Sequence, residues 1–219
     1  MIDSFRHKGM RKKLVDELAS KGINDARVLD AINSIPRHQF LDTAFVNFAY
    51  QDKSFPIGSG QTISQPYTVA FQSQLLQIKP YEKVLEVGTG SGYQAAVLTL
   101  LEADVYTIER QRKLFIKTKK FLPELGYKCM FVYGDGYKGI PKLAPFDKII
   151  ITCGAPFVPE DLVAQLKVGG RMVAPIGDGD IQVMHLIEKL SATETRITTH
   201  GEFSFVPMLN DKNSGNLNI

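Results

Sequence analysis

The sequence predicts an α/β fold, with a doubly wound, mostly parallel sheet that carries helices on both faces. From residue 80 onward, short apolar runs alternate with segments of helical period, and a glycine-rich turn joins the first run to the first helix. The run Ile149-Ile150-Ile151 is apolar on both faces, as a central strand requires. Alternation of this kind is typical of a parallel sheet covered on both sides.

The chain before residue 80 predicts a helical extension. Apolar residues recur every four positions among Lys and Arg in residues 4–21, which indicates an amphipathic helix that ends at Gly22. Asn24 or Asp25 can cap a second helix, which must end before Pro36 because the residue preceding a proline disfavours helical geometry. We interpret the basic residues of the first helix as a solvated face rather than a site for a polyanion.

The α/β part is expected to hold five strands and three helices. The expected strands are residues 83–87, 104–109, 129–133, 147–152 and 171–175, and the expected helices are residues 92–101, 110–125 and 159–166. Gly126 and Gly169 are placed as the stops of the second and third of these helices. Two longer strands follow, at 182–190 and 195–206, and we expect them to pair antiparallel at one edge of the sheet. The polar tail from Asn210 onward is expected to fray.

We predict one domain over residues 1–219, because a chain of 219 residues with 44% apolar content suffices for one core of ordinary size. Its expected parts are N-terminal helices with a loop (1–79), a core (80–180) and C-terminal strands with a tail (181–219). Residues 52–67 are dense in Gly, Ser and Pro and have neither a helical nor a strand period. They predict a long loop.

Composition excludes several kinds of partner. The 26 Lys and Arg against 23 Asp and Glu leave a net charge of +3, too small for a protein whose main work is binding nucleic acid. Apolar stretches are interrupted within about ten residues, well short of a membrane span, and the N-terminal segment is too charged for a signal peptide. We therefore expect no nucleic-acid partner and no membrane partner, and we expect a monomer.

Cysteine and histidine usage predicts a cytoplasmic protein without a metal site. Cys129 and Cys153 are too few for a disulfide scaffold, and no Cys/His cluster has the spacing of metal ligands. His38 and His185 stand alone in the sequence. We interpret both histidines as structural.

The sharpest local signal is VLEVGTGSGYQAAVL, in which a strand is followed by Gly88, Gly90 and Gly92 and then by a helix. Such a turn lets a ligand approach the backbone closely and directs helix N-terminal amides at it. Glu109 ends the next strand, 21 residues after Gly88, where an acidic residue can accept hydrogen bonds from ribose hydroxyls. The pattern indicates a cofactor that contains a nucleoside.

The same motif favours S-adenosyl-L-methionine over a nicotinamide dinucleotide. A dinucleotide loop needs a third glycine where this chain has Tyr93. Glu86 would repel a pyrophosphate but could hold an amine, and S-adenosyl-L-methionine has an amine, a sulfonium and no phosphate. Asp135, which follows the third strand, is placed to accept from the adenine amino group; the alternative is an ordinary turn aspartate.

Further motifs between residues 35 and 208 carry a family resemblance. They are IPRHQF, PIGSGQTISQPY, LEVGTGSGYQAAVL, TIER, GDG, APFDKIII, QLKVGGRMVAPIG and FVPM. With them the chain resembles the protein-L-isoaspartate O-methyltransferases, which methylate isoaspartyl residues of damaged proteins. The glycine motif is shared by many methyltransferases, whereas GQTISQPY and FVP are more specific to this family. The resemblance implies a Rossmann-like class I fold dependent on S-adenosylmethionine, with isoaspartyl proteins and peptides as partners.

The resemblance also implies the residues of the site. Ser64 is expected to be catalytic, in a segment beside the methyl donor. The expected cofactor-binding residues are Gln61, Thr62, Ile63, Tyr67, Glu86, Gly88, Thr89, Gly90, Gly92, Tyr93, Glu109, Arg110, Asp135, Gly136 and Thr152. The expected substrate-binding residues are Ser59, Gly60, Ser64, Val206 and Pro207. Leu209 departs from the pattern, because some relatives carry a polar residue there, and it is left out of the expected site.

The implied reaction transfers a methyl group to the free α-carboxylate of an L-isoaspartyl residue. That carboxylate is ionised near neutral pH and is itself the nucleophile, so no general base is needed. The methyl ester then closes spontaneously to a succinimide, which hydrolyses partly to normal aspartate. Other hypotheses are a methyltransferase for another carboxylate, a small molecule or a nucleic-acid base, and a binding module without activity. No Asn-Pro-Pro-aromatic or Asp-Pro-Pro-aromatic tetrapeptide is present, which disfavours a flipped base as substrate.

Overall fold

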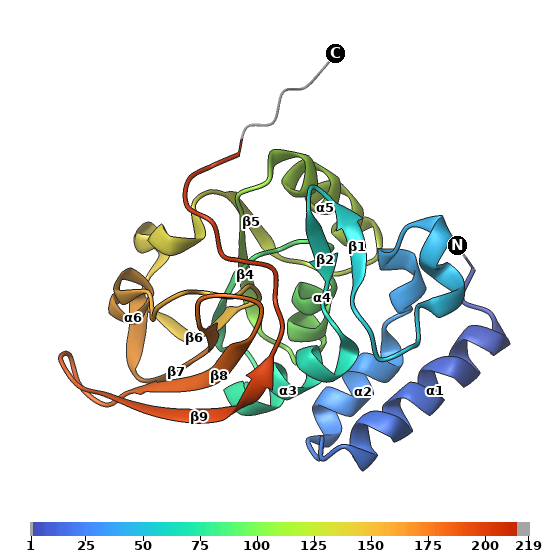
Figure 1. Ribbon diagram of the computed structural model, residues 1–219, viewed down its shortest axis with the longest axis horizontal. Coiled ribbons are helices and arrows are strands. Elements are labelled where there is room, and N and C mark those ends of the chain that lie inside the picture. Colours follow the sequence, from blue (N-terminus) through green and yellow to red (C-terminus); the bar gives the residue numbers. More distant parts are fainter. Residues whose placement is uncertain (1, 214–219) are drawn as a thin grey trace.

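The computed structural model describes residues 2–213 and contains a seven-stranded sheet with helices on both faces (Figure 1). Its strand order is β5-β4-β3-β6-β7-β8-β9, parallel as far as β7 and antiparallel from β7 to β9. The strands are β3 (Lys83–Val87), β4 (Asp104–Glu109), β5 (Met130–Tyr133), β6 (Phe146–Ile151), β7 (Leu166–Ile176), β8 (Gln182–Lys189) and β9 (Thr195–Phe203). The expected sheet with an antiparallel C-terminal edge is confirmed.

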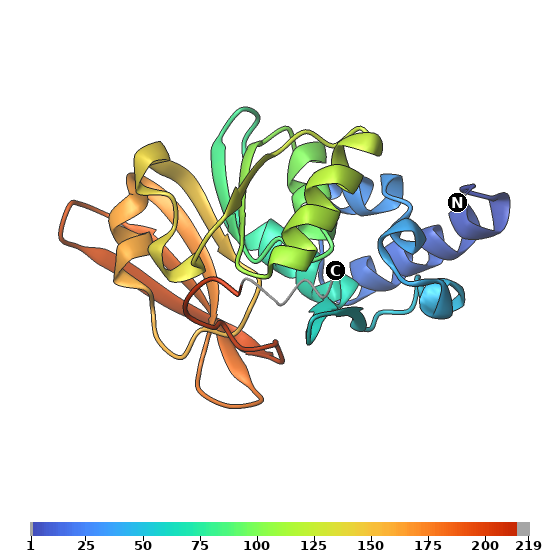
Figure 2. The ribbon, with the colours of Figure 1, turned by 90° about the horizontal axis from the view of Figure 1, so that it is seen from above.

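The helices pack in two layers of unequal size, with α1 to α5 around one hydrophobic core and α6 over the other. They are α1 (Phe5–Ser20), α2 (Ala26–Ser34), α3 (Pro66–Leu76), α4 (Tyr93–Leu100), α5 (Arg112–Glu124) and α6 (Glu160–Gln165), with short 3-10 helices at Arg37–Phe40, Thr43–Phe48, Gly136–Lys138 and Pro141–Leu143. Figure 2 shows α1 and α2 at one end of the molecule and β7 to β9 at the other. Within residues 2–213 no helix is both long and apolar enough to cross a membrane.

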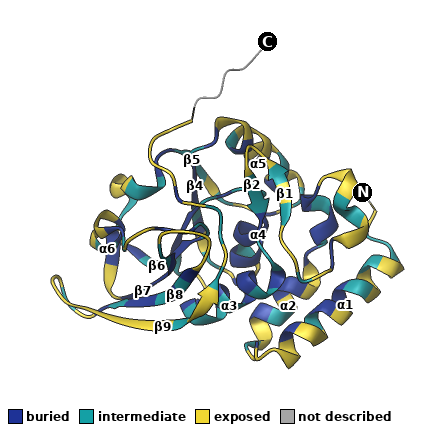
Figure 3. Cartoon of the chain, viewed as in Figure 1, coloured by how far each residue is buried: buried dark blue, intermediate teal, exposed yellow. Residues whose placement is uncertain are grey.

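The apolar residues of β6 serve two cores. Ile150 belongs to the cluster formed with α1 to α5, whereas Ile149 and Ile151 belong to the cluster beneath α6, and all three are fully buried. Burial is densest in the central strands and α4 (Figure 3). The expectation that residues 149–151 form a central strand is therefore confirmed, because β6 pairs with β3 on one side and β7 on the other.

The segment 52–67, expected to be a loop, is more ordered than the sequence indicates. It contains an antiparallel hairpin of β1 (Phe55–Gly58) and β2 (Gln61–Ile63), followed by the first turn of α3. The hairpin strands are only four and three residues long, and β1 contains a Pro and a Gly, which hides their period of two. Helix α3 has buried residues around most of its surface, because it is enclosed by α2, α4 and the sheet, and so it has no amphipathic period either.

Three further expectations need correction. Gly126 follows α5 with a φ of +90°, as expected, but Gly169 lies inside β7 rather than at the end of a helix. The last strand ends at Phe203 and not at residue 206. Residues 210–213 do not fray: the Asn213 amide donates to the Arg110 carbonyl oxygen at 2.9 Å. The rest of the tail lies outside the described residues.

Candidate functional site

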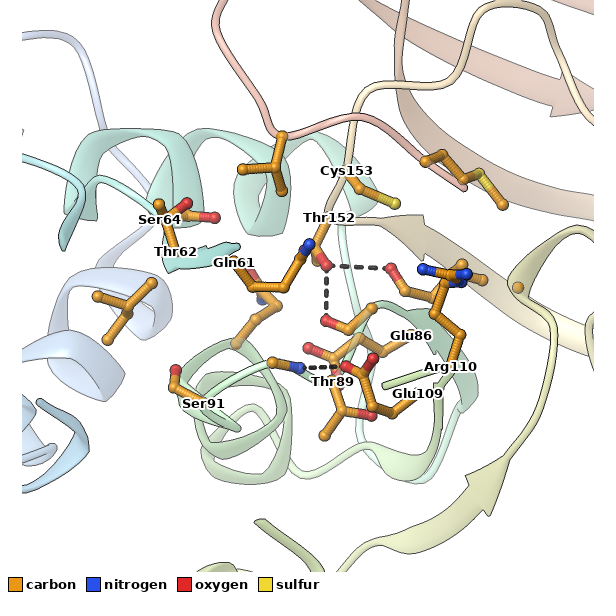
Figure 4. A pocket seen from close by; sticks show the side chains of 18 of the residues that line it. Gln61, Thr62, Ser64, Glu86, Thr89, Ser91, Glu109, Arg110, Thr152 and Cys153 are labelled. Atoms are coloured by element: carbon orange, nitrogen blue, oxygen red, sulfur yellow. Dashed lines mark hydrogen bonds between the residues drawn. The ribbon is translucent and has the colours of Figure 1, made fainter. Parts of the chain in front are cut away.

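A pocket lies at the carboxyl ends of β3, β4 and β6 (Figure 4). The chain leaves β3 for β4 on one side and later returns to β6 on the other, so the strand order reverses beside β3. Ligands of open α/β sheets bind at such a reversal. The remaining walls of the pocket come from the β2–α3 segment and from residues 206–209 after β9.

The turn after β3 has a conformation that favours glycine. Gly88 has a φ of +101°, and a Cβ atom placed there would lie 2.6 Å from the Thr152 hydroxyl oxygen. That hydroxyl donates to the Gly88 carbonyl oxygen at 2.7 Å. The hydroxyl of Thr118 on α5 donates to the Gly90 carbonyl oxygen at 2.7 Å. Hydroxyl groups from two distant segments thus fix the turn that faces the pocket.

Glu109 is held rigidly at the end of β4. Its carboxylate accepts the Gly90 amide at 2.9 Å and the Gln111 amide at 2.7 Å. Burial raises the pKa of Glu109, while these amide hydrogen bonds favour its charged form. The carboxylate is therefore pre-positioned to accept hydrogen bonds from a ligand in the pocket.

Glu86 lies deeper and is fully buried. The Thr107 hydroxyl donates to its Oε2 at 2.5 Å, whereas its Oε1 has no partner of hydrogen-bonding geometry among the described residues. Burial raises the pKa of Glu86 to about 8, and the Thr107 hydroxyl offsets only part of that effect. In the free protein at neutral pH this carboxyl is mostly protonated, and it offers an oxygen to a cationic ligand.

The segment Gln61–Ser64 forms the opposite wall of the pocket. It comprises β2 and the residue after it, and it places hydroxyl and amide groups opposite the glycine turn. The Ser64 hydroxyl makes no hydrogen bond with any residue of the described chain. No histidine or carboxylate in residues 2–213 is thus placed to take its proton, and the hydroxyl is free to donate to a ligand.

The structure brings most of the expected site residues together. Those that line the pocket are Gln61, Thr62, Ile63, Ser64, Glu86, Gly88, Thr89, Gly90, Tyr93, Glu109, Arg110, Gly136, Thr152, Val206 and Pro207. The lining does not include Ser59, Gly60, Tyr67, Gly92 or Asp135.

The residues outside the lining have visible local roles. Ser59 and Gly60 form the exposed turn between β1 and β2. Tyr67 packs on Phe203 with 6.3 Å between ring centroids. Gly92 caps α4 with a φ of +83°. Asp135 accepts from the Tyr137 amide at 3.0 Å and lines a neighbouring hollow, so its expected contact with adenine stays a prediction.

Several residues that the sequence did not single out contribute to the pocket. Thr107 and Thr118 hold Glu86 and the glycine turn, and no motif marks them. Leu209, which was left out of the expected site, lines the pocket next to Met208. Cys153 also lines it, and burial raises the pKa of this thiol to about 12. The thiolate, which is the reactive form of this side chain, is therefore disfavoured near neutral pH.

The histidines form a cluster that sequence spacing did not reveal. Ligand atoms of Asp3, His7 and His38 lie within 4.8 Å of one another, far along the chain from the pocket residues. The Asp3 oxygens accept from Arg11, and His7 Nδ1 accepts the Ser4 amide. Burial lowers the pKa of His38 to about 4, with its Nδ1 bonded to the Tyr50 hydroxyl. The sequence suggested that His38 is isolated, but in the structure it lies beside Asp3 and His7. A structural role still fits these contacts.

Comparison with known proteins assigns the chain to a family. The sequence profile described as protein-L-isoaspartate(D-aspartate) O-methyltransferase (PCMT) matches residues 9–213. The chain belongs to this family. Two relatives named protein-L-isoaspartate O-methyltransferase, from Christiangramia forsetii and Flavobacterium johnsoniae, are 61% and 58% identical to it over 214 residues, which cover 97% of this chain and 100% of each relative.

Solved structures share the fold. A protein-L-isoaspartate O-methyltransferase that is 31% identical matches with a TM-score of 0.80 over 90% of this chain and 65% of its own length. A Plasmodium falciparum structure, solved in complex with S-adenosyl-L-homocysteine, is 24% identical and matches with a TM-score of 0.79 over 91% of this chain and 98% of its own. The class I methyltransferase fold and the methylation of isoaspartyl residues, both expected from the motifs, are confirmed.

Proposed function

We propose that Gln61–Ser64 hold the α-carboxylate of an L-isoaspartyl residue against S-adenosyl-L-methionine, and that Ser64 orients this carboxylate for methyl transfer. The observation that carries the proposal is the pocket itself. It places a segment with free hydroxyl and amide groups opposite a glycine turn and two buried carboxyl groups. This division suits one anionic and one cationic reactant.

The donor half of the pocket fits S-adenosyl-L-methionine. Glu109 is fixed by two amides and can accept hydrogen bonds from ribose hydroxyls. Glu86, with one unpartnered carboxyl oxygen, can bind the donor's amino group. Gly90 leaves the backbone open to close approach by the ligand, because a Cβ there would meet only the Ile57 side chain at 3.4 Å and the Gly88 carbonyl oxygen at 4.0 Å among the described residues. Gly88 lets the turn pack against the Thr152 hydroxyl. Gly136 lines the pocket and Asp135 lines the neighbouring hollow, so we propose that the adenine lies on this side.

The acceptor half supplies orientation rather than acid–base chemistry. A carboxylate oxygen attacks the donor methyl, the carbon–sulfur bond breaks, and the sulfonium becomes a neutral thioether, so no proton moves. Holding two reactants in line can lower such a barrier by roughly 7–11 kcal/mol. Excluding water also favours the reaction, because the two opposite charges cancel on transfer. No metal takes part in this proposal.

Replacing Ser64 tests the acceptor half. Ser64→Ala should lower kcat for an isoaspartyl peptide by about tenfold to a hundredfold, the loss expected when one hydrogen bond to a charged group is removed. Calorimetry should find the affinity for S-adenosyl-L-homocysteine unchanged, since Glu86, Glu109 and the glycine turn remain. Ser54→Ala, at an exposed serine outside the pocket, is the matched control.

Two results would remove Ser64 from this role. A wild-type kcat for Ser64→Ala would show that backbone amides orient the carboxylate alone. A methylated or acylated Ser64 trapped during turnover would show a covalent intermediate instead of direct transfer.

A further inference from the structure

Arg37 is a fully buried cation close to the acceptor segment. Its side chain has no exposed surface, and it forms no hydrogen bond or ion pair with a carboxylate of residues 2–213. Instead Nε donates to the Ala49 carbonyl oxygen at 3.1 Å, and Nη2 donates to those of Lys53 at 3.3 Å and Ser64 at 2.9 Å. The guanidinium also lies 4.6 Å from the centroid of the Tyr93 ring, which lines the pocket. One side chain thus joins both flanks of the β1–β2 hairpin.

Asp52 holds the residues that follow Ser64. Its side chain is only 4% exposed. One oxygen accepts the Tyr67 amide at 2.8 Å, and the other accepts Gln65 Nε2 at 3.0 Å and Lys21 Nζ at 2.7 Å. Asp52 therefore fixes the start of α3, one to three residues beyond Ser64.

Arg37 and Asp52, which carry opposite charges, both bind the chain around Ser64. Arg37 binds the carbonyl group of Ser64, and Asp52 binds donors of Gln65 and Tyr67. Burial lowers the pKa of Arg37, while nearby groups including the Tyr93 side chain and Asp52 favour its charged form. Burying charge in this way is unfavourable compared with apolar packing, so it is weak evidence for a purely stabilising role. It does fix geometry, because a guanidinium fork donates its hydrogen bonds only in set directions.

We propose that Arg37 and Asp52 are positioning residues for methyl transfer: together they fix the peptide around Ser64 so that its hydroxyl meets the substrate carboxylate in line with the donor methyl. This inference rests on the proposed role of Ser64. In-line transfer is sensitive to displacement, and a shift of about 1 Å can slow a reaction by about a hundredfold. We name the pair the Ser64 clamp.

Kinetics of two conservative variants test the clamp. Arg37→Lys keeps the charge, but a single ammonium cannot reach three carbonyls with the geometry of the fork. Asp52→Asn keeps the size but gives up the charge and one acceptor. Each should lower kcat for an isoaspartyl peptide by at least about tenfold, with KM and the affinity for S-adenosyl-L-homocysteine nearly unchanged. The double variant should lose less than the product of the two single losses, because the residues act on one segment.

A matched control separates positioning from stability. Arg11 is also a buried arginine of the N-terminal extension, and it bonds Asp3, Tyr50 and the Asn33 carbonyl group, none of which lines the pocket. Arg11→Lys should lower the melting temperature and leave kcat unchanged. If Arg37→Lys fails to fold, Asp52→Asn is tested alone, with hydrogen exchange at the Tyr67 amide as a second measurement. That amide should exchange faster in Asp52→Asn than in the wild type, because it loses its carboxylate acceptor.

The clamp is refuted if Asp52→Asn keeps the wild-type kcat. It is also refuted if the clamp variants and Arg11→Lys lose the same melting temperature and the same share of kcat. These outcomes leave the activity of the wild type, and hence the proposed function, untouched. The proposed role of Ser64 fails separately, when Ser64→Ala retains full activity.

Discussion

Among single residues of the pocket, Glu86 is the carboxyl group that we expect to change its charge when the donor binds. It is fully buried with one unpartnered oxygen, and burial raises the pKa to about 8. A carboxyl in that state is mostly neutral at pH 7 and becomes charged when a cation binds beside it. Binding of the donor should therefore be coupled to loss of a proton from Glu86.

This coupling predicts proton release. At pH 7, binding of S-adenosyl-L-homocysteine should release close to one proton per site, because the protonated amino group of the ligand favours the ionised form of Glu86. Release should fall as the pH rises through 8, because a growing share of Glu86 is already ionised in the free enzyme. Calorimetry in buffers of different ionisation enthalpy measures this number.

The Glu86→Gln variant is the control for that measurement. It should release no proton and bind the ligand about 1–3 kcal/mol more weakly, since a charge-assisted hydrogen bond is lost. If the binding enthalpy of the wild type were independent of the buffer at pH 7, the assignment of the amino group to Glu86 would be wrong.

At the scale of elements, the sequence predicted the strand–turn–helix unit well and the hairpin poorly. β3 and β4 have the expected limits, because each is a buried apolar run with a clear end. The hairpin and α3 were missed because their order comes from contacts with distant residues, as when Asp52 binds the Tyr67 amide. For the same reason, spacing located Glu109 and the glycines, but no local pattern could show that Arg37 reaches the Ser64 carbonyl group.

The glycine turn offers a prediction at this scale. Gly88→Ala should destabilise the protein and weaken binding of S-adenosyl-L-homocysteine, because its Cβ would meet the Thr152 hydroxyl at 2.6 Å in a left-handed backbone conformation. Gly126→Ala has a similar φ of +90° but meets nothing within 4 Å. It should lose only about 1 kcal/mol of unfolding free energy and bind the ligand normally.

Thermal unfolding and calorimetry of the two variants decide this point. Equal loss of affinity in both would mean that the turn acts through general stability. Normal affinity in Gly88→Ala would mean that packing of the turn against the Thr152 hydroxyl does not shape the ligand site.

At the scale of the whole molecule, residues 204–213 form a strap that joins the two halves of the sheet across the pocket. The Met208 amide donates to the Gly154 carbonyl oxygen at 2.7 Å near β6, and Arg110 at the end of β4 donates to the carbonyl oxygens of Asn210 and Asp211. Met208 and Leu209 cover the pocket between these points. Because the strap lines the pocket, we expect it to influence how fast a ligand leaves.

Arg110→Ala should therefore speed dissociation of S-adenosyl-L-homocysteine. Losing two hydrogen bonds from a charged donor loosens the strap and should raise koff by about tenfold or more, while the melting temperature of the free protein should change little because both hydrogen bonds lie at exposed positions. Stopped-flow displacement measures koff. An unchanged koff would show that the strap does not limit release.

We propose that the α-carboxylate of isoaspartyl residues is methylated in this pocket. The most direct test incubates the wild-type enzyme with S-adenosyl-L-methionine labelled in its methyl group and two peptides that differ only in an isoaspartyl or an aspartyl linkage. Label should enter the isoaspartyl peptide as a base-labile ester, which releases methanol, and should not enter the aspartyl peptide. Equal labelling of both peptides, or labelling of neither, would show that the protein does not selectively methylate isoaspartyl residues.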